Sequence, residues 1–125
     1  MIICVDFDGT VCVHEYPKVG RDIGAQGVLK ELVRAGHQLI LWTMRDKKEL
    51  KDAVKWFSDN SITLHGVNCN PTQKSWTSSP KAFAHLYIDD MALGAPLVQP
   101  LGSERPYIDW KAVHTMLTNM GVLPQ

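Results

Sequence analysis

Short apolar runs alternate with amphipathic segments along this chain. The apolar runs are typical of strands that a parallel sheet buries on both faces, and the amphipathic segments have the spacing of helices with one buried side. The sequence predicts strands at 2–5, 39–42, 63–67 and 86–88, and helices at 22–35, 46–60 and 109–121. Strands that alternate with helices predict an α/β fold, a doubly wound, Rossmann-like parallel sheet with helices on both faces.

Two segments show neither a helical nor a strand period. Residues 11–21 contain Pro17 and Gly20, and they predict a short flap that follows the first strand. Residues 68–80 are polar and rich in turn-forming residues, and a loop of this length inside a compact domain is more often functional than an ordinary connection. At 125 residues the chain is expected to form one domain, residues 1–125.

Composition narrows the classes of function and partner. The 13 basic and 13 acidic residues cancel, so no net field favours nucleic acid or an anionic membrane. The three cysteines form no Cys-x-x-Cys pair, which argues against a zinc site and fits a reducing cytoplasm. No targeting segment or membrane span is visible, and we expect a cytoplasmic protein. The apolar stretch 91–101 predicts a surface for self-association into a homo-oligomer.

Candidate chemistry begins where the first strand ends. Asp6 and Asp8 follow the apolar run, Gly9 permits a tight turn, and Thr10 offers a hydroxyl. Two carboxylates so close repel unless a cation lies between them, and Mg²⁺ binds through such oxygens.

Other polar residues end the later strands of the predicted sheet. Thr43 follows the second strand, and Asp89 and Asp90 follow the last. Ligands of open α/β sheets bind outside the carboxyl ends of the strands, so the sequence predicts that these residues meet at one site.

This set of residues resembles the haloacid dehalogenase (HAD) superfamily of phosphohydrolases, in its small, capless form. The Asp-Phe-Asp-Gly-Thr string, the threonine that ends a strand and the acidic pair match its first, second and fourth motifs. Lys81 is the best match to the lysine motif, with Lys74 in reserve. Residues 11–21 and 44–80 hold no additional domain that would form a cap.

The resemblance implies a Mg²⁺-dependent phosphatase that acts on a phosphate monoester. Asp6 would be the nucleophile that forms an aspartyl-phosphate, and Asp8 the general acid and base. Thr43 and Lys81 would hold the phosphoryl group. The metal ligands would be Asp6, Asp89 and the backbone carbonyl of Asp8, and Asp90 would lie behind them, orienting Lys81 or a metal-bound water.

Further contacts and alternatives remain open from the sequence. Gly9, Thr10, His14 and Arg45 are predicted to contact a small phosphorylated substrate, which the flap and the loop 68–80 would cover as a lid. A phospho-acceptor signalling module or a catalytically inactive binding module on the same fold is the alternative. Receiver domains place adjacent acidic residues after the first strand, whereas here Phe7 separates the pair.

Overall fold

The structure, a computed structural model, describes residues 1–125 and contains a parallel sheet of four strands in the order β3-β2-β1-β4. The strands are β1 (Ile2–Val5), β2 (Gln38–Leu41), β3 (Gly66–Val67) and β4 (Leu86–Ile88). Val5 pairs with Leu41 on one side and with Ile88 on the other, so the strands end at one edge. The chain moves from β1 through β2 to β3 and then crosses to β4 on the far side of β1. The order of the strands therefore reverses beside β1, where open α/β sheets bind ligands.

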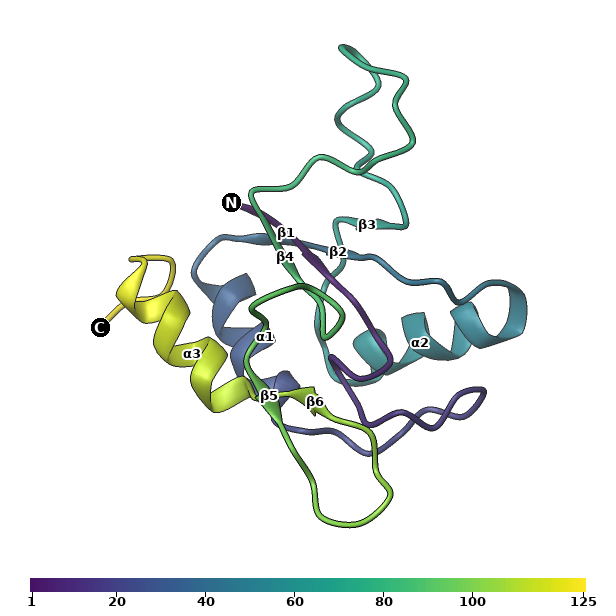
Figure 1. Cartoon of the computed structure of the whole chain (residues 1–125). Helices are drawn as coiled ribbons and strands as arrows, with labels where there is room; N and C mark the ends of the chain where they lie inside the picture. The colour runs from purple at the N-terminus through teal and green to yellow at the C-terminus, as the bar shows by residue number, and fades with distance from the viewer.

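The three helices pack on one face of this sheet. They are α1 (Ala25–Arg34), α2 (Lys47–Asp59) and α3 (Trp110–Asn119). Buried residues of all three helices share one core cluster with the sheet side chains Ile3, Val5, Leu39 and Leu41. Figure 1 shows α1, α2 and α3 side by side along the sheet. The α/β arrangement is as predicted, but the expectation of helices on both faces is wrong.

The other face of the sheet is covered by irregular chain. Its side chains Cys4 and Ile40 are buried against Ala82, and Trp42 packs at the margin of this small cluster. A right-handed crossover from β3 to β4 must pass over this face, because the two strands lie on opposite sides of β1 and β2. The crossover contains no helix, so the segment before β4 lies where a helix would otherwise pack.

Two buried amide side chains hold the loop that makes this crossover. Gln73 donates from Nε2 to the carbonyl oxygens of Ser79 and Lys81, and its Oε1 accepts from the backbone N–H of Phe83. Asn70 donates from Nδ2 to the carbonyl oxygen of Phe83. The loop projects at the top of Figure 1, whereas β1 and β4 run toward the lower right. The loop therefore extends away from the predicted site, contrary to the expected lid.

The helix and strand boundaries agree closely with the pattern of the sequence. β1, β4 and the start of α3 lie where predicted, and the side chain of Asp109 caps α3 by accepting from the backbone N–H of Ala112. α1 begins at Ala25, three residues after Asp22. The sequence did not predict the short antiparallel strands β5 (Leu97–Val98) and β6 (Tyr107–Ile108), which pair with each other next to α3. None of the helices is long and apolar enough to cross a membrane.

Candidate active site

Three carboxylates meet where β1 and β4 end. Asp6 follows β1 directly, and its backbone N–H donates to the carbonyl oxygen of Ile88 at the end of β4. Asp89 and Asp90 follow Ile88. One carboxylate oxygen from each of Asp6, Asp89 and Asp90 lies within 4.8 Å of the other two. The strand register thus brings together residues that are more than eighty positions apart, as the sequence predicts.

Thr10 and His14 fix the orientation of this cluster. The Thr10 hydroxyl donates to Asp6 Oδ2 at 3.0 Å and lies 3.4 Å from Asp90 Oδ1, and it also accepts from the backbone N–H of Asp90. His14 Nε2 lies 2.9 Å from Asp90 Oδ2. Because these side chains bind the acidic cluster, the structure gives Thr10 and His14 a different role from the predicted substrate contact. Asp90 is accordingly held by Thr10 and His14.

Gly9 is required by the same close packing. Its φ is +80°, which favours glycine, and a Cβ built at this position would collide with His14 Nε2 and with Asp90 Oδ2. Any side chain here would push the flap away from the acidic cluster. Gly9 therefore allows the side chains of His14 and Asp90 to lie close to its backbone.

The cluster is electrostatically unfavourable when its carboxylates are ionised. Burial and, next in size, the charge of Asp89 together raise the pKa of Asp6 to about 8. Burial likewise raises the pKa of Asp89 above its usual range. No lysine or arginine forms an ion pair with Asp6 or Asp89. A cation bound among these oxygens would relieve the repulsion.

Asp8 lies in a different environment, although only Phe7 separates it from Asp6. Arg45 donates to both oxygens of Asp8, from Nε at 2.8 Å and from the second guanidinium nitrogen at 2.7 Å. Arg45 is 3% exposed, and its guanidinium carbon lies 5.0 Å from the Phe7 ring centre. The neighbouring carboxylate of Asp8 raises the pKa of Arg45. Arg45 was predicted to contact substrate, but it is buried and neutralises Asp8.

Arg45 also connects this ion pair to the flap. It donates to the carbonyl oxygens of Pro17 and Lys18 in the flap and to that of Glu49 in α2. The sequence places Arg45 two residues after Thr43, at the same edge of the sheet, but nothing local indicates its acidic partner. That contact spans 37 positions along the chain.

Thr43 lies beside the acidic cluster as predicted. It lines a cavity of about 330 Å³ together with Asp6, Asp89 and Asn68. Asn68 was not among the predicted site residues, and its Oδ1 accepts from the backbone N–H of Thr43 at 2.8 Å. Asn68 has a φ of +53°, and an asparagine directly after a strand, in a position that needs a positive φ, is the signal that could have identified it.

Lys81 does not contact the acidic cluster. Its Nζ lies 5.8 Å from the ring centre of Tyr87, on the face of the sheet without helices, and it forms no ion pair. Tyr87 in turn lines a cavity with Asp6 and Asp89. Lys74, the reserve candidate, is exposed in the loop 68–80, which projects away from the site.

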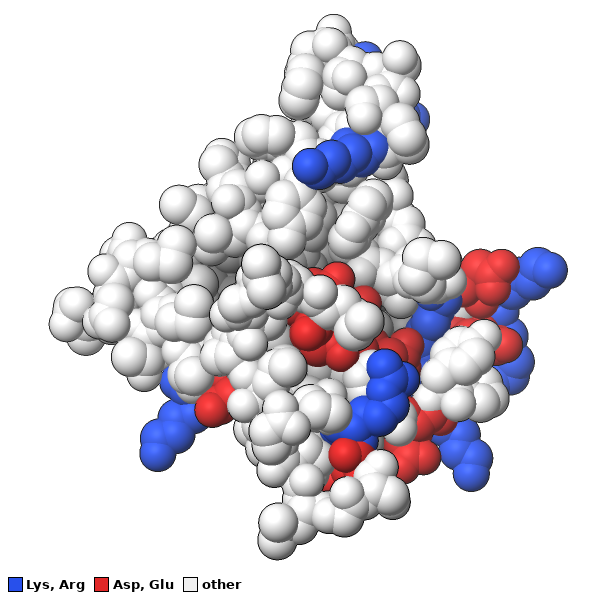
Figure 2. Space-filling model, viewed as in Figure 1, with Lys and Arg blue, Asp and Glu red and all other residues white.

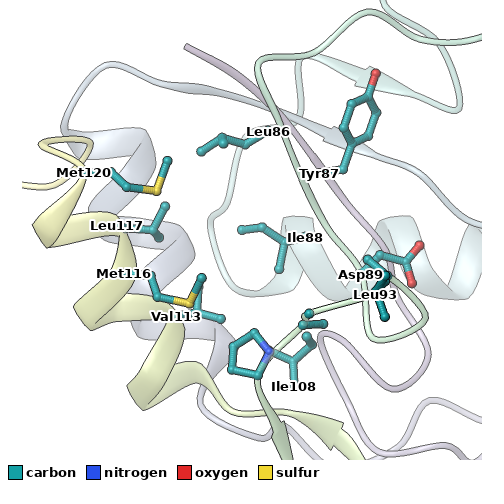
Figure 3. A pocket seen from close by; sticks show the side chains of 14 residues that line it. Leu86, Tyr87, Ile88, Asp89, Leu93, Ile108, Val113, Met116, Leu117 and Met120 are labelled. Carbon is teal, nitrogen blue, oxygen red and sulfur yellow. The ribbon is translucent and has the colours of Figure 1, made fainter.

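Apolar residues border the site on two sides of β4. On the helix side, a groove of about 210 Å³ lies between β4 and α3, and Figure 3 shows Met116, Leu117 and Ile88 facing into it. Tyr87 and Asp89 project away from this groove, on the other side of the β4 ribbon (Figure 3). In the view of Figure 2, acidic side chains lie near the middle of the molecule, next to basic ones, whereas the surface over α3 is largely uncharged. Asp89 nevertheless borders the groove, which therefore adjoins the acidic cluster at the end of β4.

Comparison with known proteins identifies one solved structure that covers nearly the whole chain. It is described as the conserved protein coded by locus from Bacteroides thetaiotaomicron, and the two chains are 32% identical with a TM-score of 0.79. The similarity covers 96% of this chain and 91% of the other. No family model and no curated protein matches the chain. This protein belongs to the same family as the conserved Bacteroides thetaiotaomicron protein.

Proposed function

We propose that this protein is a Mg²⁺-dependent phosphatase of the HAD type, capless, that hydrolyses a small phosphate monoester. One observation carries the proposal. The carboxylates of Asp6, Asp89 and Asp90 converge without a lysine or arginine partner where the strand order reverses. Burial and mutual repulsion destabilise the ionised form of these carboxylates. Binding of a cation among them would relieve that repulsion, as a metal-dependent site requires.

The donor set fits magnesium. All three side chains offer hard carboxylate oxygens, and Mg²⁺ is bound through a few such groups together with waters and substrate phosphate. Asp6 and Asp89 would hold the ion, with the backbone carbonyl of Asp8 as the predicted further ligand. When bound, the ion would neutralise negative charge between the nucleophile and the phosphate. Asp90, which His14 holds, would position Asp6 through the Thr10 hydroxyl that contacts both carboxylates.

The reaction would proceed in two displacements at phosphorus. A carboxylate oxygen of Asp6 would form a bond to phosphorus as the ester bond breaks, and the protonated form of Asp8 would give its proton to the departing alkoxide. Water would then attack the same phosphorus and lose a proton to Asp8, which releases inorganic phosphate and restores Asp6. Thr43 borders the cavity next to Asp6 and would bind a phosphoryl oxygen.

The ion pair between Asp8 and Arg45 suits the second displacement better than the first. In the structure both oxygens of Asp8 accept hydrogen bonds from Arg45, so Asp8 is held as a base. For the first displacement one of these bonds must be exchanged for a proton. We expect this exchange to occur as substrate binds next to Asp8.

Two other contacts support a second candidate function. Arg45 holds the carboxylate of Asp8, and Lys81 lies over the ring of Tyr87. This arrangement would also suit a phospho-acceptor, or an inactive module that binds metal and phosphate without turnover. In such a protein Asp6 would take up one phosphoryl group or none.

Hydrolysis of p-nitrophenyl phosphate, measured with Mg²⁺ and with EDTA, tests the proposal. The phosphatase should release many equivalents of nitrophenol per protein molecule, only with the metal. A phospho-acceptor would stop after one equivalent, and an inactive module would release none. A parallel screen of phosphorylated metabolites would then define the substrate.

Cytoplasmic location and self-association also remain proposals. Leu93 and Leu101 are fully exposed in the segment 91–101, which supports an apolar surface that a second copy would cover. Light scattering during size-exclusion chromatography should then give twice the mass of the chain or more, and a monomer at all concentrations would contradict it.

A further inference from the structure

The absence of a helix between β3 and β4 leaves one face of the sheet accessible next to the acidic cluster. Trp42 follows β2 and Tyr87 lies in β4, on either side of β1 on this face, and Tyr87 is 41% exposed. Trp42, Tyr87 and Met91 line a cavity of about 200 Å³ that Asp6 and Asp89 close at one end. A helix in the usual position would fill this space.

A second cavity continues from the first around the same carboxylates. Its volume is about 330 Å³, and it shares Asp6, Trp42 and Asp89 with the first cavity and adds Met44. Met44 is 98% exposed and therefore borders the entrance. Binding sites for drug-sized ligands occupy roughly 300–1,000 Å³. The two cavities thus offer room for a compact molecule whose phosphate lies at Asp6.

The walls of these cavities carry little that would recognise a polar group. The acidic residues Asp6 and Asp89 are the only charged residues that line them. Among the polar side chains that border the larger cavity, Thr43 Oγ1 is engaged as an acceptor by the backbone N–H of Arg45, and its own O–H remains for the phosphoryl group. Asn68 Oδ1 is engaged by the backbone N–H of Thr43, so its amide N–H₂ is the one further donor at this end. Tyr87 is engaged too, since its hydroxyl donates to the carbonyl oxygen of Ala82. The rest of the walls is apolar, and its largest side chains are Trp42, Tyr87, Met44 and Met91.

We infer that the ester group of the substrate is a flat aromatic ring, which lies against Trp42 and Tyr87 on the face of the sheet that no helix covers. The inference rests on the proposed function for the phosphate end of the substrate. Aromatic rings are the ligands that stack on indole and phenol faces, and one stacked base contributes about tenfold or more to binding. An uncharged ring also avoids the acidic residues, whereas a second phosphate or carboxylate would be repelled by them.

Substitution of Trp42 separates this inference from general phosphatase activity. Trp42→Leu keeps an apolar side chain against Cys4 and Ile40 but removes the plane on which a ring would stack. The kcat/KM for phenyl phosphate and for adenosine 5′-monophosphate should fall about tenfold in this variant, and that for glycerol 1-phosphate should not change. Comparing each substrate with itself cancels the intrinsic reactivity of the leaving groups. The two aromatic substrates distinguish a ring attached directly to the phosphate from one attached through ribose.

Two further variants guard against a trivial result. Trp76→Leu is the matched control, because Trp76 is an exposed tryptophan that packs on Phe83 in the loop 68–80, and this change should affect no substrate. Tyr87→Leu is the second test variant and should reproduce the selective loss if Trp42→Leu does not fold, as judged by circular dichroism. Equal losses for all three substrates, or no loss for any, would overturn the inference.

A binding measurement keeps the inference testable if no ester is hydrolysed. Phenylphosphonate and 2-hydroxyethylphosphonate cannot turn over, and their affinity for the protein with Mg²⁺ is measurable by calorimetry. A preference for phenylphosphonate that Trp42→Leu abolishes would support the aromatic site even though the proposed phosphatase had failed. Equal binding of the two phosphonates, or a preference that survives in Trp42→Leu, would overturn the inference whatever the activity.

Discussion

The two aspartates of the first motif show how little sequence distance is needed to create opposite electrostatic environments. Asp6 faces two other carboxylates and no basic side chain, and its pKa is raised to about 8. Asp8 faces Arg45, which donates to both of its oxygens. The first aspartate requires a cation that the chain does not provide, whereas the second has one built in. An extended backbone would point positions 6 and 8 to the same side, but β1 ends at Val5 and the chain turns after Phe7, so the two carboxylates reach different partners.

The largest effect is expected at Asp6, where a substitution should lower the activity without lowering the stability of the metal-free protein. Asp6→Asn removes the nucleophilic oxygen anion, so turnover should fall by roughly 10⁴-fold or more. The same change removes one of the repelling carboxylates, so the metal-free protein should be at least as stable as the original. Kinetics and thermal unfolding in EDTA measure the two effects. Hydrolysis close to that of the unsubstituted protein would show that Asp6 is not the nucleophile.

Replacing Asp8 should damage catalysis in a way that depends on the leaving group. Asp8→Asn keeps the shape but cannot deliver a proton, and the loss of one acid or base group lowers rates by roughly 10²–10⁴-fold. Alkyl phosphates, whose leaving groups need the proton, should lose more than p-nitrophenyl phosphate, and the Mg²⁺ requirement should change little. Equal losses for the two kinds of ester would contradict the role of Asp8 as the acid.

Breaking the ion pair from the other side should cost stability. Arg45→Met leaves Asp8, Pro17 and Lys18 without their hydrogen-bond donor, and removal of one partner from a buried pair destabilises by about 3 kcal/mol or more. Urea unfolding measures this loss. The matched control is Lys48→Met, which breaks an exposed pair with Asp52 and should leave stability almost unchanged. Similar effects of the two substitutions would mean that Arg45 contributes no more than a surface charge.

The smallest expected effect is the pH dependence of the metal-free protein. The pKa of Asp6 is about 8 in the folded state, whereas an ordinary aspartate has a pKa near 3.8. The folded state therefore binds the proton more tightly than the unfolded state, so the resulting stabilisation is complete below pH 3.8 and is lost as the pH rises through 8. A loss of 1 kcal/mol lowers the Tm of a domain of this size by roughly 3–6 °C. Unfolding in EDTA should therefore show a Tm that falls between pH 5 and 8 by more than it does in Asp6→Asn. Added Mg²⁺ should raise the Tm more at pH 8 than at pH 5, and an equal rise would count against a metal site at Asp6.

The sequence predicted those parts of the site that depend on strand ends. Asp6, Thr43 and Asp89 directly follow apolar runs, and parallel pairing brings them to one edge whatever the details of packing. The partners of these residues could not be predicted in the same way. His14 reaches Asp90 across 76 positions and Arg45 reaches Asp8 across 37, and such contacts depend on how the flap folds back.

The prediction of helices on both faces of the sheet came from a general rule for α/β folds whose premise this chain does not meet. Helices on both faces follow from helical crossovers on both sides of the sheet, but residues 68–84 contain no helical period. The same polar segment that was correctly predicted to be a loop therefore argued against a helix on that face. Lys81 illustrates the consequence, because without a helix to position it the side chain lies over Tyr87 instead of at the acidic cluster.

The flap contacts of Arg45 have a consequence for how the protein moves. The guanidinium that neutralises Asp8 also holds the backbone of the flap at Pro17 and Lys18. Opening the flap therefore strips hydrogen bonds from the group on which the charge of Asp8 depends, and any ligand that draws Arg45 away from Asp8 loosens the flap by the same free energy. Thermodynamic linkage makes the two processes reciprocal. In this chain the displacement of a surface segment and the pairing of Asp8 with Arg45 are a single coupled equilibrium.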